Sequence, residues 1–170
     1  MEHKKVVKLE YEINLSDKNK GEKMNKERVQ AAIRALNKLN ILKEKIEVLD
    51  DEIEIIKTEY NSIKSINYSG ISAKQNKVSV IEKIVINKEE QLLELYTKKA
   101  ELELEAKDIE RKLKKLNEKY RIVIEGRYGE HKKTWRQLAN ELMYSESYCR
   151  NKLIYSALLN FEEMLETSNI

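Results

Sequence analysis

Two long stretches of the chain carry apolar residues mostly at steps of three and four. The first stripe comprises Val29, Ile33, Leu36, Leu39, Ile46, Leu49, Ile53, Ile56, Tyr60 and Ile63. The second alternates steps of four and three, with two lysines interrupting the apolar residues, and comprises Ile81, Val85, Lys88, Leu92, Leu95, Lys99, Leu102, Ala106, Ile109, Leu113, Leu116, Tyr120 and Val123. This spacing is typical of a coiled-coil seam. The chain has no proline and only four glycines in 170 residues, so little interrupts a helix.

Residues 67–77 (NYSGISAKQNK) separate the two stripes and read as a loop, because they are polar, contain a glycine and show no period. A short loop between two long helices predicts that the second folds back on the first. We therefore expect an antiparallel helical hairpin, a coiled-coil stalk, over residues 25–116. Two helices alone seldom bury enough apolar surface to be stable, which makes a homodimer through the hairpin a second expectation.

We interpret the first 24 residues as an N-terminal arm and a linker. Residues 6–15 (VVKLEYEINL) alternate strictly between apolar and polar side chains, which favours a half-buried strand. A lone strand cannot satisfy its own backbone groups, so it would pair with its copy in a homodimer or with a partner's sheet. A flexible arm or a helical turn are the alternatives. Residues 16–24 (SDKNKGEKM) read as a linker.

Residues 117–165 hold three helical patterns separated by short breaks at 128–131 and at 143–144. The middle pattern begins with Thr134, and Gln137 follows three residues later, which is the spacing of a capping box. Ser145 can cap the third pattern. Two short capped helices joined by a tight turn predict a helix-turn-helix, so the expected fold is all-α: a long hairpin followed by a C-terminal three-helix helix-turn-helix module.

The same residues carry a family resemblance. Residues 118–128 (EKYRIVIEGRY), 133–142 (KTWRQLANEL) and 144–147 (YSES) resemble region 4 of bacterial sigma factors, which reads the promoter −35 element. Within that superfamily the chain is most similar to the ArpU-like and RinA-like regulators of late transcription in phages and prophages. Residues 157–165 (ALLNFEEML) resemble the close of the ArpU-like pattern.

The resemblance is specific over roughly the last third of the chain. Two residues depart from its pattern: Met143 stands where the turn usually has Gly, and Cys149 stands where Val, Ile or an aromatic residue anchors the third helix. The resemblance implies sequence-specific binding of double-stranded DNA at a promoter-like site. It further implies action with host RNA polymerase, as a sigma-like factor or a late-gene activator. Nothing in the chain matches the sigma region that binds the −10 element, so an activator is favoured over a complete sigma factor.

Helical spacing divides the third helix into two faces. Cys149, Leu153, Ala157 and Phe161 recur at steps of four and are expected to pack inward. The residues expected to face outward and read base edges are Glu146, Ser147, Arg150 and Asn151. Arginine can clasp guanine and asparagine can clasp adenine in the major groove.

Basic residues gather before the helix-turn-helix. Between residues 107 and 133 there are ten Lys or Arg and five acids, a net charge of +5 that suits phosphate contact, although a solvated helix face would look the same. The candidates for phosphate contact are Arg127, Lys132, Lys133, Arg136 and Tyr148, and Tyr148 could also pack against the module. We expect Trp135 and Tyr128 in the core.

The sequence offers no pattern for catalysis or for a cofactor. Its carboxylates lie beside lysines at helix-surface spacing, and there is no nucleophile elbow, no phosphate-cradling glycine loop and no metal-spaced cluster. The one cysteine excludes an internal disulfide. No apolar run reaches the ~18 residues of a membrane span and no signal peptide is evident, so we expect a cytoplasmic protein without membrane contact.

The expected function is therefore sequence-specific transcription regulation of the phage type. The first alternative is a phage DNA-packaging protein resembling a small terminase subunit, although in those the DNA-binding part usually precedes the helical hairpin. The second alternative is a coiled-coil adaptor that binds only protein. Ring-sized oligomers would favour packaging, and failure to bind any duplex would favour the adaptor.

Overall fold

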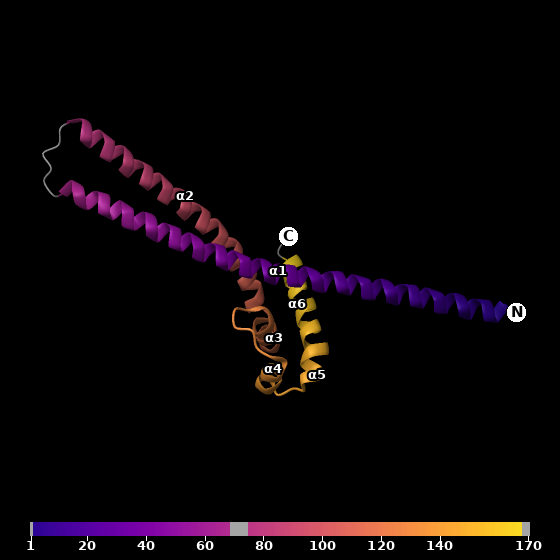
Figure 1. The fold of residues 1–170 in the computed structure, drawn as a ribbon. Helices are drawn as coiled ribbons and strands as arrows, with labels where there is room; N and C mark the ends of the chain where they lie inside the picture. The colour runs from indigo at the N-terminus through magenta and orange to yellow at the C-terminus, as the bar shows by residue number, and fades with distance from the viewer. Residues whose placement is uncertain (1, 69–74, 168–170) are drawn as a thin grey trace. The chain divides into compact units, whose positions relative to one another are not determined.

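The computed structural model describes the backbone of residues 2–68 and 75–167, and the side chains of residues 24–65 and 80–167. All described elements are helical. They are α1 (Glu2–Tyr68), α2 (Gln75–Lys114), α3 (Glu118–Tyr128), α4 (Trp135–Leu142), α5 (Glu146–Tyr148), the π-helical turn η1 (Cys149–Leu153) and α6 (Ile154–Glu166). The last three follow one another without a break and are called the third helix (residues 146–166) below. The expected all-α fold, an antiparallel α1–α2 hairpin followed by short helices packed together, is confirmed (Figure 1).

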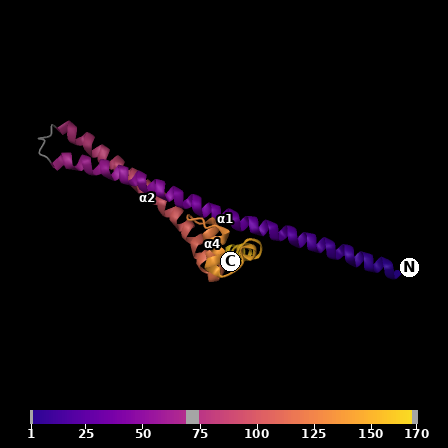
Figure 2. The same ribbon diagram turned by 60° about the horizontal axis from the view of Figure 1, so that its bottom comes forward.

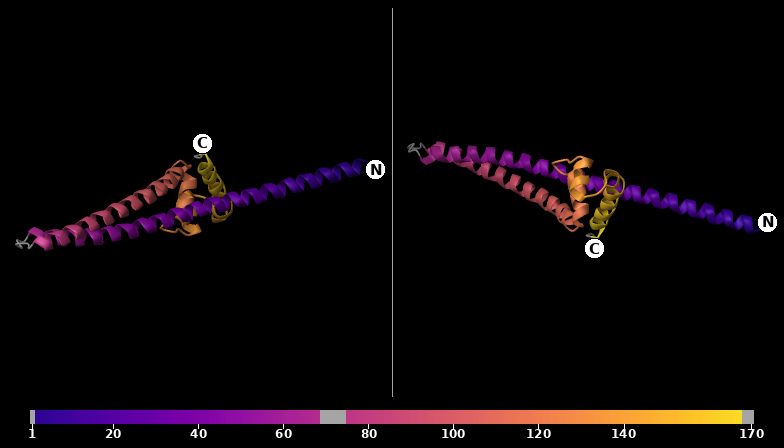
Figure 3. Two further views of the ribbon diagram at one scale, coloured as in Figure 1. Left: turned by 90° about the horizontal axis from the view of Figure 1, so that it is seen from above. Right: turned by 90° about the horizontal axis from the view of Figure 1, so that it is seen from below.

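The first 24 residues are not a strand and a linker. From Glu2 onward the backbone is helical and continuous with the rest of α1 (Figure 3). The physical reason is that a helix satisfies its own backbone hydrogen bonds, whereas the strand expected at residues 6–15 would need a partner. Lys, Glu and Leu have good helix propensity, and Gly21 alone costs only about 1 kcal/mol, which neighbouring turns tolerate.

The chain divides into two compact units. The first comprises residues 1–38 together with 109–170, and we call it the terminal unit; the second comprises residues 39–108, and we call it the hairpin unit. This division differs from the expected one, because the first part of α1 groups with the C-terminal helices rather than with the hairpin.

In the hairpin unit, α1 and α2 run antiparallel, and the expected seam lies between them (Figure 1). Leu49 and Ile53 of α1 are buried there. The two lysines that interrupt the α2 stripe pair with α1 carboxylates: Lys88 Nζ lies 2.6 Å from Glu59, and Lys99 Nζ contacts Asp50. These cross-helix pairs set the register of the hairpin. The expected loop at 67–77 falls mostly outside the described residues, since α1 ends at Tyr68 and α2 begins at Gln75.

In the terminal unit, α3, α4 and the third helix pack against one another around one small core. Figure 2 shows the ribbons of these short helices gathered together. The largest fully buried side chains of this core are Phe161, Ile124, Leu138, Leu153, Val123 and Cys149. Each short helix contributes apolar residues from one face only, so none of them could be stable alone, and mutual packing supplies their stability.

Candidate nucleic-acid interface

α3 is capped at its start and closely packed at its end. The Asn117 side chain accepts a hydrogen bond from the Lys119 amide, which satisfies one orphan donor of the first turn. Near the end of the helix, Gly126 lies against the buried Leu138 of α4. A Cβ at this position would come within 2.6 Å of a Leu138 methyl carbon, so the absence of a side chain lets α3 and α4 approach.

α4 begins with the expected capping box. The Thr134 hydroxyl accepts from the Gln137 amide at 3.3 Å, and the Gln137 side-chain oxygen accepts from the Thr134 amide at 2.8 Å. α4 ends at Met143, which adopts the left-handed conformation with φ 55° and ψ 38°. In the part of the chain that the structure describes, Met143 is the one non-glycine residue with positive φ. This conformation turns the chain sharply toward the third helix.

The third helix starts at a cap and contains a wide turn. Ser145 Oγ accepts a hydrogen bond from the Tyr148 amide at 3.2 Å. From Cys149 to Leu153 the helix is π-helical, and the amide of Ile154 donates to the carbonyl of Cys149. Such single wide turns inside α-helices are frequent at functional sites.

The inward face of the third helix is the expected one. Cys149, Leu153, Ala157 and Phe161 are all fully buried, which confirms the prediction. Burial raises the pKa of the Cys149 thiol, so this side chain stays protonated and behaves as a small apolar residue.

The four residues predicted to read bases all lie exposed on the first turns of the third helix. They form two parallel pairs one turn apart. Arg150 Nη2 lies 2.9 Å from Glu146 Oε1, and Asn151 Nδ2 donates to Ser147 Oγ at 3.2 Å. Both pairs are surface contacts worth only a few tenths of a kcal/mol, roughly 0.2–0.5 each, so a stronger bidentate partner can displace them.

The structure separates the five residues predicted to contact phosphate. Lys132 and Arg136 are exposed and make no ion pair with any described residue. Lys133 pairs with Glu141 at 2.6 Å, and Tyr148 packs its ring against Tyr144, with 4.9 Å between the ring centroids. These four side chains remain at the surface.

Arg127 is held within the module instead. Its guanidinium donates to the Lys133 carbonyl at 2.9 Å and lies over the Trp135 ring, 4.4 Å from the ring centroid. It therefore anchors the loop between α3 and α4. Trp135 and Tyr128 were predicted to lie in the core, and this prediction was wrong. Both residues are half-buried, because they border a groove.

One wall of that groove is a segment of α1 that the sequence analysis placed in the hairpin. Val29 and Ile33 of α1 line it together with Trp135, Arg150 and Tyr155, and its volume is about 410 Å³. Asn151 lines it too, so the groove beside the α1 segment reaches both Arg150 and Asn151, the two residues predicted to contact guanine and adenine. The first turns, with Glu146 and Ser147, remain exposed.

An ion pair fastens α1 to the third helix. Arg28 Nε lies 2.6 Å from Glu162 Oε2, and Arg28 Nη2 lies 3.1 Å from Glu163 Oε1. The hydrogen bond to Glu162, followed by that to Glu163, raises the pKa of Arg28. Glu162 is buried, and a buried carboxylate needs a partner. In the sequence, Glu162 is an acidic residue on an otherwise apolar face of the third helix. That position indicates the need for a cationic partner, but it does not identify Arg28 as that partner.

Within the described ranges, no three His, Cys, Asp or Glu side chains cluster in a way that could hold a metal ion. None of the helices over those same ranges is long and apolar enough to cross a membrane.

The chain was also compared with known proteins. Comparisons with protein families, with curated proteins and with solved structures give no match.

Proposed function

We propose that the protein is a sequence-specific DNA-binding regulator of transcription, of the phage type that its C-terminal third resembles. The reading element is the N-terminal part of the third helix. The observation that carries this proposal is the arrangement of one short capped helix, a left-handed turn and a second capped helix whose first turns expose Glu146, Ser147, Arg150 and Asn151. A helix-turn-helix presents its second helix to the major groove in this way.

Two features of the site support a role in base reading. The face opposite the four exposed residues is buried, so the helix is fixed about its own axis and the polar groups keep one direction. Arg150 and Asn151 line the groove beside α1, yet all four side chains are exposed and so remain accessible. Arg150 can then form two hydrogen bonds to guanine O6 and N7, and Asn151 two to adenine N6 and N7.

We assign the phosphate contacts to the exposed cationic side chains beside this helix. Lys132 and Arg136 carry no intramolecular ion pair among the described residues, so binding phosphate breaks no existing pair. Lys133 would have to exchange Glu141 for phosphate, and Tyr148 can donate its hydroxyl. Host RNA polymerase is the partner that the resemblance implies for activation.

The testing experiment begins with selection of duplexes from a random pool. The winning duplex is then titrated over a salt series with wild type, Arg150→Ala, Arg136→Ala and Lys98→Ala. Arg150→Ala should cost about 1–3 kcal/mol and relax the preference at one or two base pairs. Arg136→Ala should weaken binding to all sequences and lower the salt slope by about one. Lys98→Ala removes an equally charged, exposed side chain of the hairpin, outside the basic zone of residues 107–133, and should change neither.

The other functions predict different outcomes. Salt-dependent binding with no enriched sequence, together with ring-sized oligomers, would support DNA packaging. No binding at any salt would support a protein-binding adaptor and would overturn the proposal, because contact with phosphates must weaken with salt.

A further inference from the structure

The hairpin unit exposes more apolar side chains than it buries. Among its described residues, nine large hydrophobic side chains are exposed and five apolar ones are buried. Two helices have no third layer to cover such side chains. The distribution of the exposed residues therefore shows where a further helix could pack.

Three of the exposed residues form a regular line along α1, which we call the outer stripe: Ile41, Val48 and Ile55. Their exposed fractions are 50%, 57% and 60%. They are spaced by seven residues, which places them almost in line along a helix, as the positions of a coiled-coil seam are. The outer stripe is distinct from the buried seam of the hairpin, which includes Leu49 and Ile53.

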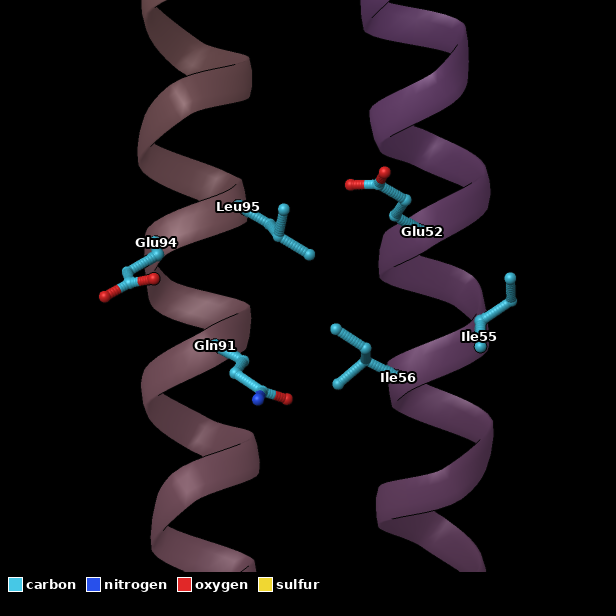
Figure 4. Close-up of a pocket in the computed structure, with 6 residues that line it drawn as sticks. All are labelled: Glu52, Ile55, Ile56, Gln91, Glu94 and Leu95. Atoms are coloured by element: carbon cyan, nitrogen blue, oxygen red, sulfur yellow. The ribbon is translucent and has the colours of Figure 1, made fainter.

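An apolar groove borders the outer stripe. It has a volume of about 270 Å³ and is lined by Glu52, Ile55, Ile56, Gln91, Glu94 and Leu95. Figure 4 shows Ile56 and Leu95 pointing toward each other between the two helices, with Ile55 on the outer side of α1. A side chain approaching the stripe near Ile55 would meet this groove.

The charges beside the stripe indicate the occupant. On the groove side, Lys45 and Glu52 flank Val48 and are both exposed. They have opposite charges at nearly equal distances along the chain from Val48. A second copy running antiparallel, with Val48 at the two-fold axis, would place its Glu52 beside Lys45 and its Lys45 beside Glu52. A parallel two-fold copy would instead bring opposite flanks together, with Lys45 beside Glu44 but Glu52 beside Asp51, so its charges would not be complementary throughout.

The opposite flank of the stripe sets the direction of approach. Glu44 and Asp51 lie there, and the same antiparallel arrangement would bring these acids toward each other. Their repulsion favours a contact displaced toward the groove side, where the charges are complementary.

We propose that the outer stripe and its groove are the interface of an antiparallel homodimer centred on Val48. Ile41 of each copy packs against Ile55 of the other and closes the groove between Ile56 and Leu95. The occupant is a second copy because the groove-side flank, with Lys45 and Glu52, complements itself in charge and the stripe complements itself in spacing. This inference does not depend on DNA binding, so either proposal can fail while the other stands.

Disulfide trapping tests the geometry directly. The native Cys149 is fully buried, so single cysteines can be added to the full-length chain. Val48→Cys should form a disulfide-linked dimer on mild oxidation, since the two copies of this position meet at the axis. Ile41→Cys alone should stay monomeric on a non-reducing gel, but mixed with Ile55→Cys it should yield a mixed dimer. Cross-linking of Ile41→Cys to itself would indicate a parallel dimer and overturn the proposal.

Sedimentation of variants with an added charge measures the affinity of the dimer. Val48→Glu should weaken dimerisation by at least ~100-fold, because it brings two carboxylates together in an apolar contact. Leu93→Glu is the matched control: Leu93 is 67% exposed but lies three residues before Tyr96, on the side of the hairpin where Lys57 approaches Tyr96. It should leave the dimer intact, and circular dichroism should show unchanged helix content in both variants.

The charge pair provides a rescue test. Lys45→Glu and Glu52→Lys should each weaken the dimer roughly 2- to 10-fold, and the double variant should recover the wild-type affinity. Three results would contradict the proposal: a monomeric wild type at high micromolar concentration, equal effects of Val48→Glu and Leu93→Glu, or a double variant weaker than both single variants.

Discussion

Replacement of Met143 by glycine should stabilise the terminal unit. Met143 has φ 55° and ψ 38°, a left-handed conformation that costs a non-glycine residue about 1–2 kcal/mol. Its side chain is 92% exposed, so little packing is lost when it is removed. Glycine gains freedom in the unfolded chain, which offsets about 0.4–1 kcal/mol. The net expectation for Met143→Gly is an increase of about 0.5–1 kcal/mol in the free energy of unfolding.

The one tryptophan of the chain makes this measurement local. Trp135 lies in α4, eight residues before Met143, so its fluorescence in a urea titration reports on the unfolding of this unit. The midpoint should rise while the m value stays constant, because the surface exposed on unfolding is unchanged.

Met143→Ala separates the backbone effect from the loss of the side chain. Alanine keeps the Cβ that makes the left-handed region unfavourable, so it should bring no stabilisation. Equal midpoints for the glycine and alanine variants would refute the reasoning.

Three further perturbations follow from the packing of the terminal unit. Gly126→Ala should destabilise it by about 1–3 kcal/mol in thermal unfolding, because a Cβ would overpack against α4; an unchanged midpoint would show that α3 and α4 can separate freely. Arg28→Ala should cost about 1–3 kcal/mol in the same assay, because Glu162 is left buried without its cation. Adding Glu162→Gln should recover part of that loss, and no recovery would assign the effect to packing. Glu146→Ala releases Arg150 from its surface ion pair, so DNA affinity should stay equal or rise a few-fold, and a large loss would mean that Glu146 itself contacts a base.

The local structure of the helix-turn-helix could be predicted because its signals are local. A capping box requires Thr134 and Gln137 three residues apart, and both hydrogen bonds of the box are present. Ser145 caps the third helix for the same reason. The spacing of apolar residues along a helix also predicts which of its faces is buried, as the buried Cys149 and Phe161 show.

The contact of α1 with the third helix could not be predicted, because an apolar period does not identify its partner. Val29 and Ile33 continue the hairpin stripe without a break, yet they line the groove beside Trp135. The error at residues 6–15 has a related cause. A period of two describes the side chains, but whether a strand forms depends on a neighbouring strand, which the sequence of one chain does not show.

The wide turn of the third helix joins its core to its exposed face. Four inward residues at successive steps of four, from Cys149 to Phe161, would drift by about 40° per step around a regular α-helix, or about 120° in all. The π-helical turn from Cys149 to Leu153 winds less per residue, which offsets part of this drift and keeps the four side chains on one buried face. Arg150 and Asn151 lie within that same turn. The residues that pack the core thus fix the direction of the residues proposed to read DNA, so core substitutions at Cys149 or Leu153 should alter binding as well as stability.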